Sequence, residues 1–216
     1  FPKNDMLLIV GNDKNRALDW HLYSYDIPAK QLTSVIDDIS YMYEMRQAGK
    51  QILLGKMSGP NLVPILYDPD VKQYHEFNLE KSTSSPIISR EVILLKNNLN
   101  GVLIRNKSAK VTAKTPLVVW LHGGPFRQIA KDYHSYPSYA VYDWVLDQLA
   151  SQGAVVFKMD YRGSYGYGNG VAYDVVNNAG KQDVADVYES VKAVKKKLNL
   201  KGSVYLMGNS YGGYLA

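Results

Sequence analysis

Two patterns of hydrophobic and polar residues divide the chain. Up to about residue 82 the pattern alternates over short stretches, so that Trp20 and Leu22 fall on one face of a segment and His21 and Tyr23 on the other. Alternation with a period of two is typical of half-buried strands, and polar turn residues separate the stretches. This part of the chain therefore predicts short β-strands and no helix of any length.

A weak repeat runs through the same region. Gly11 is echoed by Gly55, and the pair Tyr25-Asp26 is echoed by Tyr67-Asp68. The spacing is roughly 43 residues, which is the length of one four-stranded propeller blade, and it predicts about two blades. An irregular antiparallel sheet is the alternative.

The pattern changes after the polar segment 82–86. A turn at Asn100-Gly101 is predicted to join strands at 91–95 and 101–104, because Asn-Gly is a strong signal for a tight hairpin. Nearly continuous apolar runs follow, of the kind found in strands covered on both faces. They span residues 116–121, 154–159 and 204–207.

Helical spacing separates these runs. Residues 139–152 and 183–200 place apolar residues three or four positions apart, as on one face of a helix. The predicted stripes are Val141, Trp144, Val145, Leu146 and Leu149 in the first segment, and Val184, Val187, Val191, Val194 and Leu198 in the second. Strands that alternate with helices predict an α/β fold with a mostly parallel sheet.

Composition excludes some functions. The 216 residues are 46% hydrophobic, enough for a real core, and their formal net charge of +5 is spread along the chain except at 195–197. We interpret that lysine run as a solvated helix end rather than a nucleic-acid site. There is no cysteine, no apolar segment long enough to span a bilayer, and no metal-ligand spacing among the histidines. The histidines are His21, His75, His122 and His134.

The chemistry is indicated by a Gly-x-Ser-x-Gly stretch after the last apolar run. Ser210 has Gly208 two positions before it and Gly212 two positions after it. A nucleophilic serine on a sharp strand-to-helix turn takes strained backbone angles, and small neighbours leave room for that turn. A loop serine with no catalytic role is the alternative.

A glycine pair follows an earlier strand. Gly123 and Gly124 come directly after His122 at the end of the 116–121 run. Backbone N–H groups there, together with the N–H of Tyr211, could stabilise the oxyanion of a tetrahedral intermediate. A flexible exit from the strand is the alternative.

Four ordered motifs then resemble the prolyl oligopeptidase family of serine peptidases, most closely its acylaminoacyl-peptidase branch. They are Leu-His-Gly-Gly-Pro-Phe at 121–126, Met-Asp-Tyr-Arg-Gly-Ser-Tyr-Gly-Tyr-Gly at 159–168, Gly-Lys-Gln-Asp-Val-Ala-Asp-Val at 180–187 and Gly-Asn-Ser-Tyr-Gly-Gly-Tyr at 208–214. The resemblance implies the N-terminal part of an α/β-hydrolase domain over residues 83–216. It also implies the last blades of a β-propeller over residues 1–82.

The resemblance also assigns roles to single residues. It implies that Ser210 is the nucleophile, that the backbone N–H groups of Gly123, Gly124 and Tyr211 form the oxyanion hole, and that Phe126 walls a substrate pocket. Asp160 and Arg162 are expected to anchor loops beneath the site. Asp183 and Asp186 are expected to cap a helix rather than to take part in catalysis.

The chain departs from the family pattern in one respect. In α/β-hydrolases the acid and the histidine follow the serine, whereas all four histidines here precede Ser210. We therefore expect the triad partners beyond residue 216, and these residues alone to be a truncated, weakly active or inactive internal fragment.

The expected function is a serine peptidase that hydrolyses short peptides through an acyl-enzyme. A carboxylesterase of the same fold and a non-catalytic binding fragment are the alternatives. We expect no cofactor, no metal, and no nucleic-acid or membrane partner. Homo-oligomerisation is left open, and a cytoplasmic location is slightly favoured over a periplasmic or secreted one.

Overall fold

The chain forms two compact units. The computed structural model describes residues 5–13, 16–39, 45–77 and 87–216. Its contacts group residues 1–84 with 132–141, which we call the blade unit, and residues 85–131 with 142–216, which we call the α/β unit. The predicted domain boundary at 82–83 lies outside the described residues.

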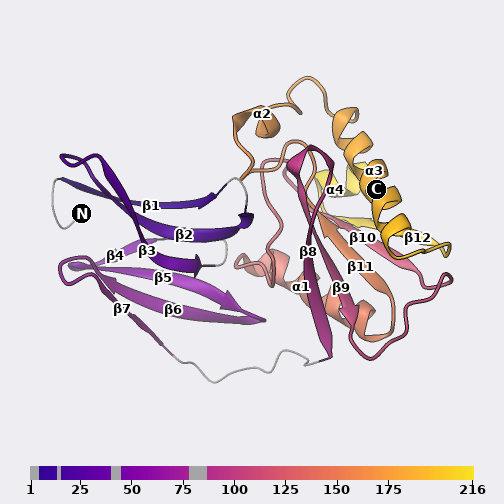
Figure 1. The fold of residues 1–216 in the computed structure, drawn as a ribbon, viewed down its shortest axis with the longest axis horizontal. Helices are drawn as coiled ribbons and strands as arrows, with labels where there is room; N and C mark the ends of the chain where they lie inside the picture. The colour runs from indigo at the N-terminus through magenta and orange to yellow at the C-terminus, as the bar shows by residue number, and fades with distance from the viewer. Residues whose placement is uncertain (1–4, 14–15, 40–44, 78–86) are drawn as a thin grey trace. The chain divides into compact units, whose positions relative to one another are not determined.

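The blade unit contains two antiparallel sheets (Figure 1). The first has three strands in chain order: β1 Met6–Asp13, β2 Arg16–Asp26 and β3 Gln31–Ile39. The second has four: β4 Arg46–Ala48, β5 Gln51–Ser58, β6 Asn61–Asp68 and β7 Gln73–Glu76. Consecutive strands pair with one another, which is the up-and-down arrangement expected of blades.

Alternate side chains of these strands form a core of their own. Leu22 on β2 is fully buried, as are Ile39 on β3 and Ile65 on β6. The same cluster contains Leu8, Ile36, Ile52, Leu54 and Tyr67. The period-two pattern therefore correctly predicted that these strands bury one face of each sheet.

The α/β unit is built on one five-stranded sheet with the order β12-β10-β11-β9-β8. The strands are β8 Ile88–Leu94, β9 Asn100–Asn106, β10 Leu117–Leu121, β11 Val155–Met159 and β12 Val204–Gly208. Strand β10 runs parallel to both β11 and β12, whereas β8 and β9 are antiparallel. Every residue of β10 and β11 is buried, as continuous apolar runs predict.

The predicted Asn100-Gly101 turn is wrong. Both residues belong to β9, and the connection from β8 is a 3₁₀ turn, η1, at Lys96–Asn98. The flanking Leu95 and Leu99 are buried, so core packing favours the longer connection over a two-residue turn. Gly101 is needed for another reason, because a side chain there would collide with the ring of Phe157 on β11.

Helices cover both faces of this sheet. They are α1 Pro137–Ser151, α2 Asn169–Ala172, α3 Gln182–Lys197 and α4 Tyr211–Leu215. Val187 and Val194 of α3 pack with Val119 and the other odd-numbered residues of β10 and β11. Trp120, on the opposite face of β10, stacks on Tyr142 of α1. The two long helices therefore lie on opposite faces.

The predicted apolar stripe of α1 is wrong in part. Val141 and Trp144 are more than half exposed, and the buried face carries Asp143 and Asp147 beside Leu146 and Ala150. Asp143 accepts a hydrogen bond from Lys158 of β11 at 2.7 Å, and Asp147 accepts one from Arg90 of β8 at 2.6 Å. Ion pairs therefore replace part of the apolar contact that helical spacing predicted.

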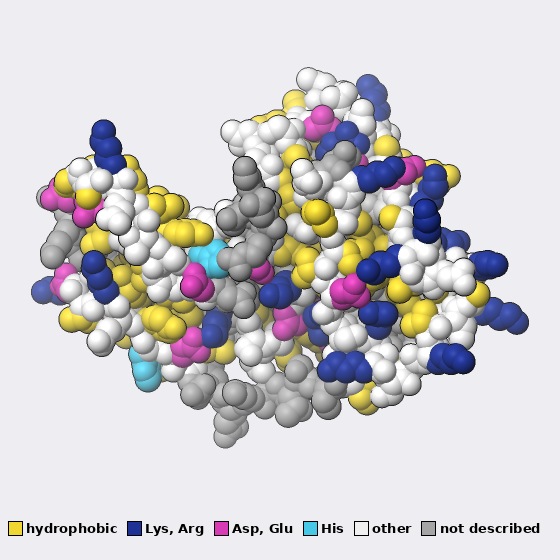
Figure 2. Space-filling view, in the orientation of Figure 1, with side chains coloured by type: hydrophobic (Ala, Val, Ile, Leu, Met, Phe, Trp, Pro, Cys, Tyr) yellow, Lys and Arg dark blue, Asp and Glu magenta, His cyan; other side chains and the backbone are white. Residues whose placement is uncertain are grey.

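Neither the basic side chains on the face shown in Figure 2 nor the helices point to a basic patch or a membrane-spanning helix among the described residues. In the face shown in Figure 2, lysine and arginine side chains are distributed over much of the α/β unit rather than gathered in one patch. No helix in the described part of the chain is long and apolar enough to cross a membrane.

Candidate active site

Ser210 lies on a sharp turn between β12 and α4. Its backbone angles are φ 53° and ψ −117°, a region that residues other than glycine rarely occupy. Its side chain is exposed, and the next residue, Tyr211, begins the helix. This strand-turn-helix geometry is what a nucleophile elbow requires.

Close backbone packing explains the glycines around this serine. A side chain at Gly208 would collide with the backbone of Gly212, and one at Gly212 would collide with the carbonyl oxygen of Leu121 on β10. Gly213 differs, because a side chain there would meet nothing closer than the carbonyl oxygen of Gly208 at 3.5 Å. The positions two before and two after Ser210 are therefore the ones that the turn requires to be glycine.

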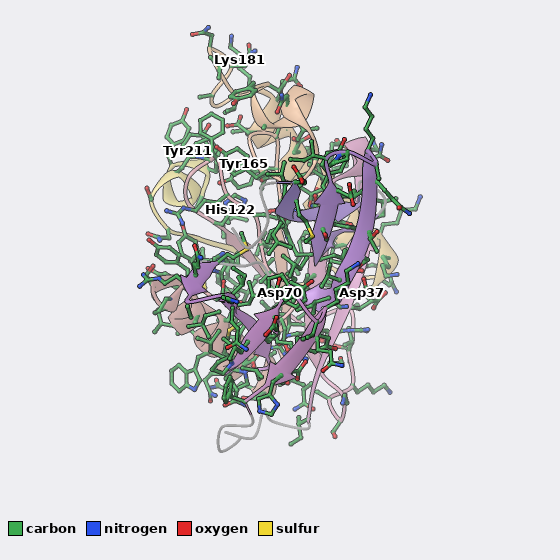
Figure 3. The ribbon with its side chains drawn as sticks, turned by 90° about the vertical axis from the view of Figure 1, so that its left-hand side faces the viewer. Asp37, Asp70, His122, Tyr165, Lys181 and Tyr211 are labelled. Carbon is green, nitrogen blue, oxygen red and sulfur yellow. The ribbon has the colours of Figure 1, made fainter. Side chains whose placement is uncertain are left out.

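The glycine pair lies at the same edge of the sheet. Leu121 of β10 is in register with Gly208 of β12, and the strands are parallel, so both chains leave the sheet side by side. The N–H of Asn209 donates to the carbonyl of Leu121 at 3.3 Å. Gly123 is buried and Gly124 is exposed, with a φ of 135° at Gly124. The structure thus brings Ser210 and the glycine pair to one place (Figure 3 labels the adjoining His122 and Tyr211).

Asp160 anchors the loops beneath this edge. It directly follows β11, is fully buried, and accepts a hydrogen bond from the N–H of Ile129 at 2.9 Å and one from the Tyr167 hydroxyl at 2.5 Å. Burial, and then the neighbouring Asp160 carboxylate, raise the pKa of Tyr167 well above its ordinary value, so this hydroxyl keeps its proton. Asp160 thereby connects the loop after β10 with the loop after β11.

Arg162 and Asp186 form a second anchor. The guanidinium donates to both carboxylate oxygens at 2.8 Å, and the backbone N–H of Arg162 donates to the same group at 2.9 Å. The hydrogen bond to Asp186 is the main reason that the pKa of Arg162 is raised. Asp186 lies in the second turn of α3, so the expectation that it caps the helix is wrong.

Asp183 binds the elbow instead of serving only as a helix cap. It is buried at the start of α3 and accepts hydrogen bonds from the N–H groups of Gly180 at 3.1 Å and Val184 at 2.9 Å, and from the hydroxyl of Tyr211. Burial, and then this hydrogen bond, raise the pKa of Tyr211 above its ordinary range. Apart from the shared motifs, no local pattern in the sequence indicates this contact.

Phe126 lies in an aromatic cluster rather than in the core. It is half-buried and stacks on Tyr165 with ring centres 5.7 Å apart, and Tyr173 lies 5.9 Å away at a tilt. Both tyrosines are substantially exposed. Sequence reasoning missed these two residues, although Tyr165 stands in the Gly-rich motif that follows β11.

No histidine is hydrogen-bonded to Ser210 in the part of the chain that the structure describes. His122 is buried and bonds the carbonyl of Gly123, while His21 bonds Asp37 in the blade unit. Within the described ranges, no group of histidine, aspartate and glutamate side chains is arranged to hold a metal ion.

The chain is similar to known proteins over part of its length. Residues 140–216 match the family model described as the prolyl oligopeptidase family, Peptidase_S9. The acylamino-acid-releasing enzyme of Sus scrofa is 30% identical over 120 residues, which are 55% of this chain and 15% of that protein. Dipeptidyl aminopeptidase BIII of Pseudoxanthomonas mexicana is 36% identical over 115 residues, 50% of this chain and 15% of that protein.

Solved structures extend the likeness to almost the whole chain. A puromycin hydrolase matches with a TM-score of 0.76 at 17% identity, covering 99% of this chain and 32% of that one. The acylaminoacyl peptidase of Pyrococcus horikoshii matches with a TM-score of 0.70 at 18% identity, covering 99% and 33%. The chain therefore spans about a third of the solved structures and a much smaller share of the curated relatives.

The fold is that of the N-terminal part of an α/β-hydrolase domain preceded by propeller-like strands. Residues 140–216 carry the match to the prolyl oligopeptidase family, and about half of the chain is similar to acylamino-acid-releasing enzymes. The expected fold class is thus confirmed for both parts of the chain.

Proposed function

We propose that the complete protein is a serine peptidase that cleaves short peptides through an acyl-enzyme on Ser210. The observation that carries the proposal is the strained, exposed Ser210 at a strand-to-helix turn, next to the loop that holds Gly123 and Gly124. Peptides are favoured as substrates because acylamino-acid-releasing enzymes and a dipeptidyl aminopeptidase are among the relatives.

The reaction has two steps. The Ser210 oxygen attacks the scissile carbonyl carbon, and the negative charge on the carbonyl oxygen is stabilised by the N–H groups of the glycine pair and Tyr211. The C–N bond then breaks, and the serine proton passes through a base to the departing amine. Water next hydrolyses the ester, which frees the acid and restores Ser210.

The base and its acid partner are proposed to come from sequence outside residues 1–216. A serine hydroxyl without an adjacent base is a poor nucleophile, and none of the four histidines is hydrogen-bonded to Ser210 among the described residues. We accordingly expect residues 1–216 alone to turn over substrate far more slowly than the complete enzyme.

Phe126 and its aromatic neighbours are proposed to wall the pocket for the substrate side chain before the scissile bond. The exposed rings of Tyr165 and Tyr173 offer apolar surface to a substrate side chain. Tyr165 lies beside the glycine loop, because its backbone N–H donates to the carbonyl of Arg127 at 2.9 Å.

A fluorophosphonate probe tests the proposal. In the complete protein we expect one probe per polypeptide, attached to the peptide that contains Ser210, and no labelling of the Ser210→Ala variant. Gly213→Ala, whose added methyl group has room, serves as a folded control that should label like wild type. Labelling that survives Ser210→Ala would refute the proposal. If the nucleophile is confirmed, turnover of a peptide amide compared with a small acyl ester distinguishes a peptidase from an esterase.

A further inference from the structure

Tyr211 contributes two groups at the elbow that lead to different parts of the molecule. Its backbone N–H follows Ser210 directly and is one of the proposed oxyanion donors. Its side chain is half-buried, with the ring centre 6.1 Å from that of Tyr161 and 5.5 Å from that of Tyr214. The hydroxyl group donates a hydrogen bond to Asp183. The proposed reaction uses the N–H alone, so the side chain requires an explanation of its own.

Asp183 is held firmly by its surroundings. It is 1% exposed and is the second residue of α3. Its Oδ2 atom accepts hydrogen bonds from the Tyr211 hydroxyl and the N–H of Gly180, and its Oδ1 atom accepts one from the N–H of Val184. The carboxylate cannot rotate without leaving buried polar groups unpaired. Because α3 packs on the sheet through its apolar face, Asp183 is a fixed point of the α/β unit.

The helix that starts at Tyr211 is much shorter than α3. α4 spans only Tyr211–Leu215, whereas α3 has 16 residues. Helices of fewer than about 12 residues are marginal on their own, so the position of α4 depends on its contacts. Gly212 packs closely on the backbone of Leu121 in β10, and the Tyr211 hydroxyl joins the first residue of α4 to α3. The bond to Asp183 therefore helps to fix the start of the helix.

The peptide group between Ser210 and Tyr211 follows the direction of α4. Its carbonyl accepts hydrogen bonds from the N–H groups of Gly213 at 2.9 Å and Tyr214 at 3.2 Å, which lie within the helix. A trans peptide is planar, and its C=O and N–H bonds point in opposite directions. The Tyr211 N–H therefore points out of the start of α4 and changes direction when α4 tilts. An oxyanion donor must lie about 3 Å from the developing charge, so a small tilt weakens it.

We propose that Asp183 is a positioning residue, which aims the Tyr211 N–H at the oxyanion by holding the Tyr211 hydroxyl and, through it, the first turn of α4. The inference rests on the proposed function, because it assumes acyl transfer at Ser210. Asp183 itself touches no reacting atom, and its effect on the reaction passes through Tyr211.

Removing the hydroxyl alone tests the inference in the complete enzyme. Tyr211→Phe keeps the ring and the backbone N–H but cannot donate a hydrogen bond to Asp183. We expect kcat to fall about 10-fold with KM nearly unchanged, because an oxyanion donor acts in the transition state. Rates are divided by the concentration of active sites, which is measured by complete reaction with the fluorophosphonate probe, so that unfolded molecules do not count.

Tyr214→Phe is the matched control. It makes the same change on the same helix, three residues later, where the tyrosine is 64% exposed. We expect its kcat to stay within about twofold of wild type. Equal values of kcat in the two variants, whether lowered or not, would show that the inference is wrong.

A double-mutant cycle identifies the partner of the hydroxyl group. Asp183→Ala removes the acceptor and should also lower kcat. Because both substitutions break the same bond, adding Tyr211→Phe to Asp183→Ala should lower kcat by less than about twofold further. If the two losses multiply instead, the hydroxyl and the carboxylate act independently, and Asp183 does not act through Tyr211.

A transition-state analogue gives a readout that a purely structural role does not change. A peptide trifluoromethyl ketone forms a tetrahedral adduct with a nucleophilic serine, and its oxygen occupies the position of the oxyanion. Its affinity should weaken about 10-fold in Tyr211→Phe, whereas binding of the corresponding product acid should not change. Equal weakening of both ligands would assign the bond to general ligand binding and contradict the inference.

Ser210→Ala separates failure of this inference from failure of the proposed function. If Ser210→Ala is inactive and Tyr211→Phe has the kcat of wild type, the inference fails while the proposed function stands. If Ser210→Ala retains turnover, the proposed function itself fails, and the inference fails with it.

Discussion

The blade unit and the α/β unit differ in the kind of side chain that they bury. Among the described residues of the blade unit, the buried polar side chains are His21 and His134. The α/β unit buries many more: Asn100, Thr115, His122, Gln128, Asp143, Asp147, Lys158, Asp160, Ser164, Asp183, Asp186 and Ser190. Burying a polar group costs free energy unless it is hydrogen-bonded, so this contrast requires an explanation.

The buried polar groups of the α/β unit serve mainly to hold loops. Asp160 and His122 order the turn after β10, Asp186 fixes Arg162 after β11, and Asp183 holds the residue that follows Ser210. The blade unit needs no such network, because paired strands satisfy their own backbone groups. The comparison indicates that the buried side chains of the blade unit serve packing, whereas the buried polar side chains of the α/β unit hold the loops around Ser210 in position.

Gly212→Ala should give the largest effect, because it forces α4 and Ser210 away from β10. The new methyl group would collide with the Leu121 carbonyl oxygen, so we expect a loss of about 100-fold or more in kcat/KM. The unfolding free energy should also fall by about 1–3 kcal/mol. Steady-state kinetics of the complete enzyme measure the first effect, and urea unfolding measures the second.

Gly213→Ala is the matched control one residue away. Its methyl group meets nothing closer than 3.5 Å, and both quantities should stay close to wild type. Equal losses at Gly212 and Gly213 would contradict the packing that we describe at the elbow.

Ile65→Ala tests whether the blade unit contributes packing alone. Ile65 is fully buried on β6, and its truncation should lower the unfolding free energy by about 3 kcal/mol. The kcat of the molecules that remain folded should not change. Leu62→Ala, on the same strand but half exposed, should cost far less in urea unfolding. A fall in kcat at temperatures where the Ile65 variant is fully folded would contradict the conclusion that the blade unit contributes packing alone.

Asp186→Asn removes the charge that pairs with Arg162. The neutral amide cannot replace the bidentate interaction, and we expect a loss of about 2 kcal/mol in unfolding free energy. Glu189→Gln, on the same helix as Asp186, removes an exposed carboxylate that binds Lys96 of η1 and Lys192 of α3 and should change stability very little. Similar losses of unfolding free energy in the two variants would show that burial of the Arg162–Asp186 pair does not determine its contribution to stability.

Tyr211→Phe should change the unfolding free energy least of these substitutions, and the change should depend on pH. The pKa of Tyr211 is raised in the folded state above its ordinary 10.0, so the folded protein holds this proton more tightly than the unfolded chain does. Its contribution to stability is therefore complete below pH 10 and is lost as the pH rises above that value. The variant should show a shallower decline in unfolding free energy above pH 10 than wild type. An identical decline would contradict the Tyr211–Asp183 bond.

Much of the fold could be predicted from local patterns. The apolar runs at 116–121 and 154–159 became β10 and β11, because a strand covered on both faces needs no alternation. The run at 204–207 became β12, although β12 lies at the edge of the described sheet and exposes Tyr205 and Leu206. The elbow was also predictable, since the turn at Ser210 depends on residues within two positions of it. For these strands and for the turn at Ser210, the pattern of neighbouring residues was sufficient to predict the structure.

Other features depend on contacts between distant residues and could not be predicted. The inner face of α1 carries Asp143 because Lys158, on a strand, lies opposite it. Asn100-Gly101 has the form of a turn but lies in a strand, because the buried Leu95 and Leu99 favour a longer connection before it. The support of the glycine loop by His122 and Asp160 joins two loops that are far apart in sequence, and no periodicity reports such a pair.

The most direct test of the account is to trap the acyl-enzyme. The complete protein, mixed with an activated acyl ester and quenched in acid within the first turnover, should carry one acyl group. Digestion and mass spectrometry should place that group on the peptide that contains Ser210, and Ser210→Ala should carry none. An acyl group on another residue, or none during measurable turnover, would contradict the assignment of Ser210 as the nucleophile.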